Sequence, residues 1–135
     1  MTKQASGPFD VKLTPMPPDA ESAGADIGRM LLDKRFHGDL DATSQGQMLS
    51  MRFLDVGSGG YVAMERVTGT LHGRTGTFAL QHSGTMTRGA PTLALTVVPD
   101  SGTGQLQGLT GSMRIIITEG RHSYAFDYAL PGSAS

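Results

Sequence analysis

The chain has 135 residues, a length that fits one domain with a sizeable core. Its 11 basic and 12 acidic residues give a net charge of -1, so the sequence lacks the basic surface of a nucleic-acid-binding domain. It contains no cysteine, which excludes disulfides, a thiolate nucleophile and a zinc–thiolate site.

Glycine and the distribution of apolar residues predict the fold class. The 19 glycines lie between short apolar runs, a pattern typical of an all-β chain with many turns. No apolar run suits a secretory signal or a membrane span, so we expect a cytoplasmic protein that does not contact a membrane. We expect one domain over residues 1–135, with flexible termini at about 1–5 and 131–135.

Alternating residues predict the first strands. Phe9, Val11 and Leu13 alternate with polar residues, and the Pro-rich residues 14–29 then predict a loop or lid. Residues 30–42 are predicted as one strand with an inward face at Leu32, Phe36 and Leu40. Residues 47–54 follow as a strand with an inward face at Leu49, Met51 and Phe53.

Residues 60–86 are predicted to form a β-hairpin around the turn 72–75. The odd positions of its first strand are apolar, apart from Glu65, and the even positions of its second strand are apolar, apart from His82. A register that places both apolar faces on the same side pairs Val67 with Leu80 and Glu65 with His82. A carboxylate and an imidazole would then face each other inside the protein.

The remaining strands are predicted over residues 92–98, 113–117 and 124–130, with a glycine-rich connection over 100–111. In the last hairpin a Gly120–Arg121 turn pairs Ile115 with Phe126 and places Glu119 opposite His122. About eight short alternating strands indicate an up-and-down barrel or a sandwich. A barrel of roughly eight strands encloses side chains or one small ligand.

Three segments carry a resemblance to a known family. They are Phe36-x-Gly38-Asp39-Leu40, then Met64-Glu65-Arg66-Val67-x-Gly69-x-Leu71-x-Gly73-Arg74-x-Gly76-x-Phe78-x-Leu80-Gln81-His82-x-Gly84, and then Val97-Val98-Pro99-x-Ser101-Gly102-Thr103-Gly104-x-Leu106-x-Gly108-Leu109-x-Gly111. Together with the ending Tyr124-x-Phe126-x-Tyr128, they resemble a bacterial family known as domain of unknown function 3224.

The resemblance implies an eight-stranded antiparallel β-barrel like that of allene oxide cyclase, and by analogy a homo-oligomer. The residues that match the family motif and could serve a site are Glu65, Arg66, Arg74, Gln81 and His82. Arg66 and Gln81 share the outward face of the hairpin, where we expect a surface or inter-subunit contact.

The Glu65–His82 pair has two interpretations. It could transfer a proton near neutral pH, or it could be an ion pair that only stabilises the fold. Tyr61 and Tyr124 are predicted on inward faces, where a phenol could donate to a developing oxyanion or could simply belong to the core.

The hypothesis for function is a cofactor-independent isomerase or cyclase that acts on a small, largely hydrophobic molecule inside the barrel. Its predicted catalytic residues are Glu65, His82, Tyr61 and Tyr124. Its predicted ligand-binding residues are Met51, Phe53, Phe78, Leu80, Met86, Leu95, Met113, Ile115, Phe126 and Tyr128. The alternatives are a non-catalytic carrier and a structural subunit of a homo-oligomer. The four histidines are scattered singly, so we expect no metal. The sequence has neither a dinucleotide-binding glycine motif nor a P-loop, so we expect no cofactor.

Overall fold

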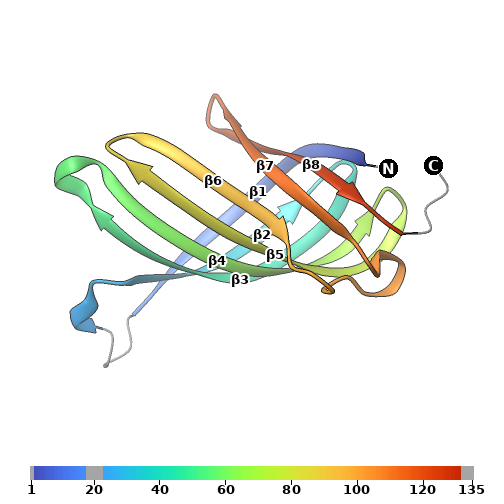
Figure 1. Cartoon of the computed structure of the whole chain (residues 1–135), viewed down its shortest axis with the longest axis horizontal. Helices are drawn as coiled ribbons and strands as arrows, with labels where there is room; N and C mark the ends of the chain where they lie inside the picture. Colours follow the sequence, from blue (N-terminus) through green and yellow to red (C-terminus); the bar gives the residue numbers. More distant parts are fainter. Residues whose placement is uncertain (1, 18–22, 132–135) are drawn as a thin grey trace.

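The structure is a computed structural model that describes residues 2–17 and 23–131. Eight antiparallel strands form a closed barrel in chain order (Figure 1). They are β1 (Lys3–Met16), β2 (Gly28–Phe36), β3 (Leu40–Phe53), β4 (Ser58–Leu71), β5 (Arg74–Thr87), β6 (Ala90–Val97), β7 (Thr110–Thr118) and β8 (Arg121–Ala129). The predicted antiparallel barrel is confirmed, and the sandwich alternative is wrong.

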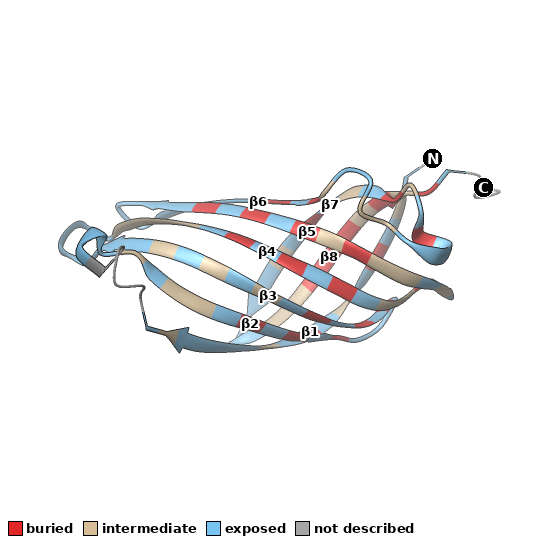
Figure 2. Ribbon diagram, turned by 90° about the horizontal axis from the view of Figure 1, so that it is seen from below, coloured by how far each residue is buried: buried red, intermediate tan, exposed pale blue. Residues whose placement is uncertain are grey.

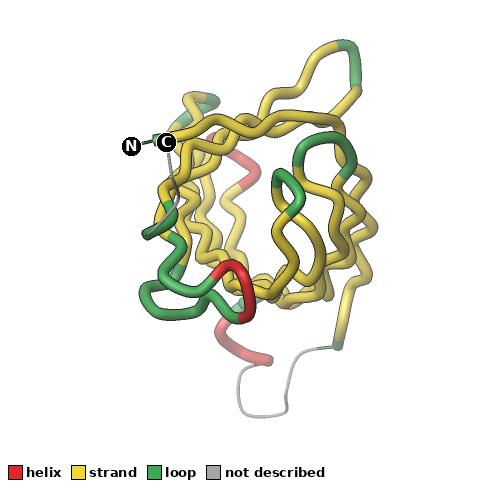
Figure 3. Tube along the Cα trace, turned by 90° about the vertical axis from the view of Figure 1, so that its right-hand side faces the viewer, coloured by secondary structure: helices red, strands yellow, loops and turns green. Residues whose placement is uncertain are grey.

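The barrel is less tightly joined at one seam. Within the described residues, Thr96 and Ser112 form the single register pair between β6 and β7. Beyond this pair the β7–β8 hairpin rises away from β6, which is visible both from the side and along the barrel (Figure 1, Figure 3). Three short 3-10 turns complete the described chain: η1 (Ala23–Ala25), η2 (Leu54–Val56) and η3 (Gly104–Leu106).

The first strand is longer than predicted. It begins at Lys3, which pairs with Tyr128 of β8, and Ala5 is fully buried, so the prediction of flexible residues 1–5 is wrong for 3–5. It ends at Met16, and β2 starts at Gly28, which shortens the predicted loop 14–29 at both ends. Residues 18–22 of that loop and residues 132–135 lie outside the described residues.

Residues 30–42 form two strands instead of the predicted one. The chain turns at His37–Asp39, where Gly38 has a φ of 87° and the backbone N–H of His37 donates to the carbonyl of Pro8. Phe36 and Leu40 both face inward, because this turn returns the chain with the same alternation of faces. The alternation of inward and outward residues therefore does not reveal the turn.

The predicted inward face of residues 47–54 is also wrong. Leu49, Met51 and Phe53 occupy outward positions and are exposed. The inward positions of β3 begin with the buried residues Leu40, Ala42 and Ser44 and continue toward the mouth of the barrel with Gly46, Met48, Ser50 and Arg52. Small and polar residues are tolerated there because this end of the barrel interior is open.

Both predicted hairpin registers are displaced by two residues. Val67 pairs with Phe78, and Ile115 pairs with Tyr124, instead of Leu80 and Phe126. The turns are the two-residue loops His72–Gly73 and Glu119–Gly120, in which both residues have positive φ. Such turns match the twist of the strands and favour glycine at the second position. Glu119 consequently lies in an exposed turn, and His122 pairs with Ile117, not with Glu119.

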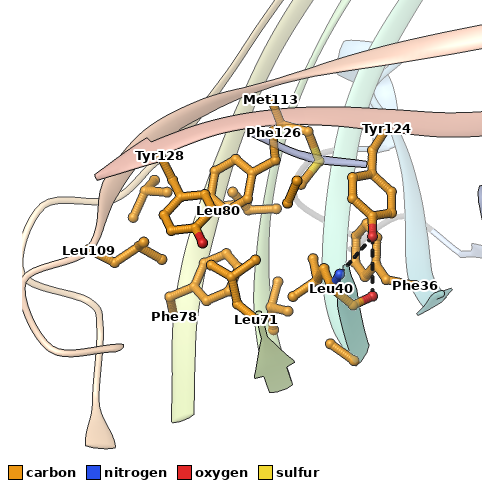
Figure 4. Packing of buried hydrophobic residues seen from close by; sticks show 14 of the residues in the cluster. Phe36, Leu40, Leu71, Phe78, Leu80, Leu109, Met113, Tyr124, Phe126 and Tyr128 are labelled. Carbon is orange, nitrogen blue, oxygen red and sulfur yellow. Dashed lines mark hydrogen bonds between the residues drawn. The ribbon is translucent and has the colours of Figure 1, made fainter. Parts of the chain in front are cut away.

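Side chains fill only one half of the barrel. The buried cluster lies toward the end that carries the β2–β3 and β4–β5 turns, while the strands are mostly exposed toward the other end (Figure 2). Phe78 and Phe126 stack with their ring centroids 5.9 Å apart (Figure 4). The connection around η3 adds the buried Leu106 and Leu109 to this core, and its Thr103 hydrogen-bonds to the backbone of Thr77.

Candidate functional site

A layer of charged side chains lies inside the barrel at the edge of the core. Glu65 faces inward from β4, and its carboxylate has no exposed surface. Lys34 from β2 donates to Oε2 at 2.8 Å, Ser44 from β3 donates to Oε1 at 2.6 Å, and Nε2 of His82 from β5 makes a short contact with Oε2. The four adjacent strands β2 to β5 thus each contribute one polar side chain to a cluster centred on the Glu65 carboxylate.

The charge state of Glu65 follows from these partners. Burial by itself would raise the pKa of the carboxyl group. The hydrogen bond from His82 and the positive charge of Lys34 outweigh this effect and lower the pKa from 4.5 to about 2. Glu65 is therefore an ionised partner in a buried ion pair at neutral pH, and its basicity is low.

Lys34 was not among the predicted site residues. Its ammonium group lies 5.5 Å from the ring centre of Phe9 and 5.9 Å from that of Phe36, so aromatic faces as well as Glu65 surround it. The sequence contained a signal, because Lys34 lies on the same face as Leu32 and Phe36. A lysine on an apolar strand face requires an internal counter-ion.

The predicted contact between Glu65 and His82 forms, although the two residues are not cross-strand partners. Glu65 pairs with Leu80, and His82 pairs with Ala63. The contact is diagonal across the β4–β5 ladder, a separation that long side chains can span. Nδ1 of His82 has no hydrogen bond within the part of the chain that the structure describes.

Tyr61 lies beside this layer on the side of the open half. Its ring centre is 6.4 Å from that of His82, and burial together with the negative charge of Glu65 raises the pKa of its phenol. The ring crosses Gly84, its partner on β5, so closely that a Cβ atom there would lie 2.4 Å from Cε1 of Tyr61. Among the described residues its hydroxyl has no hydrogen-bond partner.

A cavity of about 750 Å³ occupies the open half of the barrel. Inward positions of β3 to β6 form most of its wall, which includes Met48, Ser50, Arg52, Tyr61, Gly84, Met86, Pro91 and Leu93. Of the predicted catalytic residues only Tyr61 lines it, and of the predicted ligand-binding residues Met51 and Met86 do. Glu65 and His82 are not in its lining and lie deeper, beyond Tyr61.

The other predicted ligand-binding residues lie elsewhere. Phe78, Leu80, Leu95, Met113, Phe126 and Tyr128 belong to the packed core, and Ile115 packs against it. Phe53 is exposed on the outer face. The core residues contact other side chains at the positions where a ligand was expected, because the packed half of the barrel leaves no room for one.

Tyr124 is separate from the charged layer. Its hydroxyl donates to the carbonyl of His37 at 2.6 Å and accepts from the backbone N–H of Leu40 at 2.8 Å, and the contact with Leu40 is drawn in Figure 4. The phenol thus holds the β2–β3 turn against β8. The structure gives it no access to Glu65 or to the cavity.

We expect Tyr124→Phe to destabilise the fold by about 1–3 kcal/mol, because it leaves the buried N–H of Leu40 without its acceptor. Chemical denaturation followed by circular dichroism measures the loss. Tyr61→Phe is the matched control, since the hydroxyl it removes has no partner within the described residues, and it should change stability by less than about 0.5 kcal/mol. Equal losses of stability in both variants would contradict the structural role assigned to the Tyr124 hydroxyl.

Two apolar grooves lie on the outer face of the same end. Leu49, Val62 and Ser83 line both, and one of them extends to Met64, Gln81 and His82. Arg66 and Gln81 both face outward, as predicted, on neighbouring strands. The grooves are a second apolar surface that could bind a hydrophobic probe, so a binding experiment must distinguish them from the cavity. The predicted homo-oligomer stays a prediction.

Within residues 2–17 and 23–131, no group of three or more histidine, aspartate and glutamate side chains is placed to hold a metal ion. No helix in the described chain is long and apolar enough to cross a membrane.

The fold and the site define a class: a closed antiparallel eight-stranded barrel, packed at one end and hollow at the other, with a buried ionic layer between the halves. The chain belongs to the DUF3224 family of proteins of unknown function, whose model matches residues 5–128. Among curated proteins none matches this chain.

A solved structure supports the membership. A DUF3224 protein of unknown function from Shewanella oneidensis MR-1, whose crystal structure was determined at 1.84 Å resolution, is 49% identical to this chain. The similarity covers 98% of this chain and 100% of that protein, with a TM-score of 0.90.

Proposed function

We propose that the protein is a non-catalytic binding protein for one small, largely apolar molecule held in the open half of the barrel. The observation that carries this proposal is the cavity of about 750 Å³. Its wall is formed by inward strand positions, and in a filled barrel the side chains at such positions would pack against one another. Met48, Met86 and Leu93 supply its apolar wall. Methionine side chains adapt to apolar ligands of irregular shape.

The seam between β6 and β7 supports an entry route from the side. Leu93 on β6 and Ile117 on β7 occupy inward positions, yet they are 42% and 63% exposed because the two strands diverge. The free hydroxyl of Tyr61 offers the ligand one hydrogen-bonding group in an otherwise apolar wall. Its raised pKa keeps the phenol protonated and able to donate at neutral pH.

A cofactor-independent isomerase or cyclase is the second candidate. The proximity of Tyr61 to His82, and of His82 to Glu65, favours it, since the three could pass a proton between the cavity and the ionic layer. It ranks second because a carboxylate with a pKa of about 2, held by Lys34 and Ser44, is a weak general base. Turnover of a ligand identified in the cavity, lost in Tyr61→Phe, would reverse this order.

The binding proposal can be tested with the neutral fluorophore N-phenyl-1-naphthylamine and two matched variants. Leu93 faces the cavity with 42% exposure, and Leu49 faces the outer grooves with 45% exposure. We expect Leu93→Asp to weaken probe binding roughly tenfold, because a carboxylate in the cavity must be desolvated when an apolar molecule enters. Leu49→Asp should leave the affinity unchanged.

Both leucines are about half exposed, so neither substitution should unfold the protein, and circular dichroism verifies this. Loss of probe binding in Leu49→Asp alone would move the site to the outer grooves. A wild-type protein that does not bind the probe would contradict the proposal.

A further inference from the structure

The charged groups around the cavity differ sharply in their surroundings. Among the described residues that line it, Arg52 is the only charged one, and there is no acidic residue in the lining. Arg52 occupies the inward position of β3 nearest the mouth and pairs with Gly59 of β4. Within the described chain its guanidinium group has neither a hydrogen bond nor an ion pair.

Within the described residues, no acidic group forms an ion pair with this arginine. Asp55 lies in η2, close along the chain, but it is not part of the cavity lining. Asp26 shares a smaller depression with Arg52 and forms no ion pair with it in the described structure. By contrast, the described Lys34 has its carboxylate partner inside the barrel. An apolar cavity with one unpaired cation at its rim favours an anionic ligand and disfavours a cationic one.

We propose that the ligand of the cavity is a small carboxylic acid with an apolar body, whose carboxylate is bound by Arg52. This inference rests on the proposed binding function and specifies its ligand class. A guanidinium group presents paired N–H donors that match the two oxygens of a carboxylate. One arginine compensates one negative charge, whereas a phosphate monoester would carry about one charge more than the rim can balance.

The register of the strands determines where the body of the acid lies. Ser50 is the next inward position after Arg52, about 7 Å deeper along β3, and it pairs with Tyr61. A ligand held by its carboxylate at Arg52 therefore extends past Met86 toward Tyr61 and Leu93. The acid head remains hydrated at the mouth, and the apolar body leaves water.

The experiment compares octanoate with octan-1-ol at pH 8 as competitors of N-phenyl-1-naphthylamine. Both molecules have eight carbon atoms and differ in the charge of the head group, so a change in the ratio of their affinities between wild type and variant isolates the contribution of the carboxylate. We expect octanoate to compete more strongly in the wild type, and Arg52→Gln to reduce this preference roughly tenfold. The affinity for octan-1-ol should not change in the variant.

Arg88→Gln is the matched control. Arg88 lies in the exposed β5–β6 turn beside Gly89, which lines the cavity, but it does not line the cavity itself. The substitution Arg88→Gln removes the same charge near the mouth. If both variants lose the preference for octanoate, only a long-range electrostatic effect is indicated, and the inference is overturned. An unchanged preference in Arg52→Gln would overturn it as well.

The design separates the two proposals. If the probe binds in a Leu93-dependent manner and octanoate is not preferred over octan-1-ol, the assignment of a carboxylic acid is wrong and the binding function stands. If neither octanoate nor octan-1-ol displaces such a probe, the assignment is likewise wrong. If the probe does not bind, the binding function fails and the inference fails with it.

Discussion

Glu65→Gln is expected to lower the free energy of unfolding by about 3–5 kcal/mol. The substitution keeps the shape of the side chain and removes its charge. Lys34 is then left inside the barrel, 6% exposed, without a counter-ion, and His82 loses a charged acceptor. The cost arises mainly from this uncompensated ammonium group. Urea denaturation at pH 7, followed by circular dichroism, measures it.

Two further variants make the result specific. Glu119→Gln removes the same charge from an exposed turn and should change stability by less than about 0.5 kcal/mol. The double variant Lys34→Met with Glu65→Gln should be more stable than the sum of the two single losses predicts, because the unpaired ammonium is gone. Additive losses, or a Glu65→Gln protein as stable as Glu119→Gln, would contradict a buried ion pair.

Acid should destabilise the protein through the same carboxylate. The pKa of Glu65 is about 2 in the folded protein against an ordinary 4.5, so the group adds stability above pH 4.5. That contribution is lost as the pH falls from about 5 to 2, because the unfolded chain binds the proton first. The difference in pKa corresponds to about 3 kcal/mol at neutral pH.

The measurement is the free energy of unfolding at pH 7, 5, 4 and 3, with wild type and Glu65→Gln compared at each value. All other ionisable groups are the same in both proteins, so the difference between the two curves isolates Glu65. We expect the stability gap to narrow by about 2 kcal/mol between pH 5 and 3. Glu119→Gln should remain parallel to wild type, and a constant gap for Glu65→Gln would show that its pKa is not lowered.

The ionic layer also explains why one end of the barrel can stay open. The core packs on one side of it, around Phe78 and Phe126, and the layer ties β2, β3, β4 and β5 together through one carboxylate. The strands therefore remain joined where apolar packing ends. The cavity beyond Tyr61 can then serve a ligand instead of stability.

Much of the fold was predictable from local patterns. Alternation of apolar and polar residues placed Glu65, His82 and Tyr61 on inward faces, because a strand has a period of two whatever its partner is. The same pattern predicted about eight strands in a barrel or a sandwich, and the resemblance to a known family implied the barrel. The motif around Glu65 and His82 indicated the family to which the chain belongs.

Registers and partners could not be predicted in this way. Shifting a hairpin by two residues leaves every side chain on its face, so alternation cannot separate the Glu65–His82 pairing from the observed Glu65–Leu80 pairing. The His72–Gly73 turn decides it, through two consecutive residues with positive φ. The same ambiguity displaced the last hairpin.

By itself the sequence determined the strand faces, except that of residues 47–54, together with the barrel and the inward position of a carboxylate beside an imidazole, since these depend on local periodicity and on recurring motifs. Only the tertiary structure showed that Lys34 contacts Glu65 and that the hydroxyl of Tyr124 hydrogen-bonds to the β2–β3 turn. It also showed that Arg52 lies unpaired at the mouth of a cavity. Each of these depends on distances between strands far apart in the chain. Closure of the barrel sets those distances.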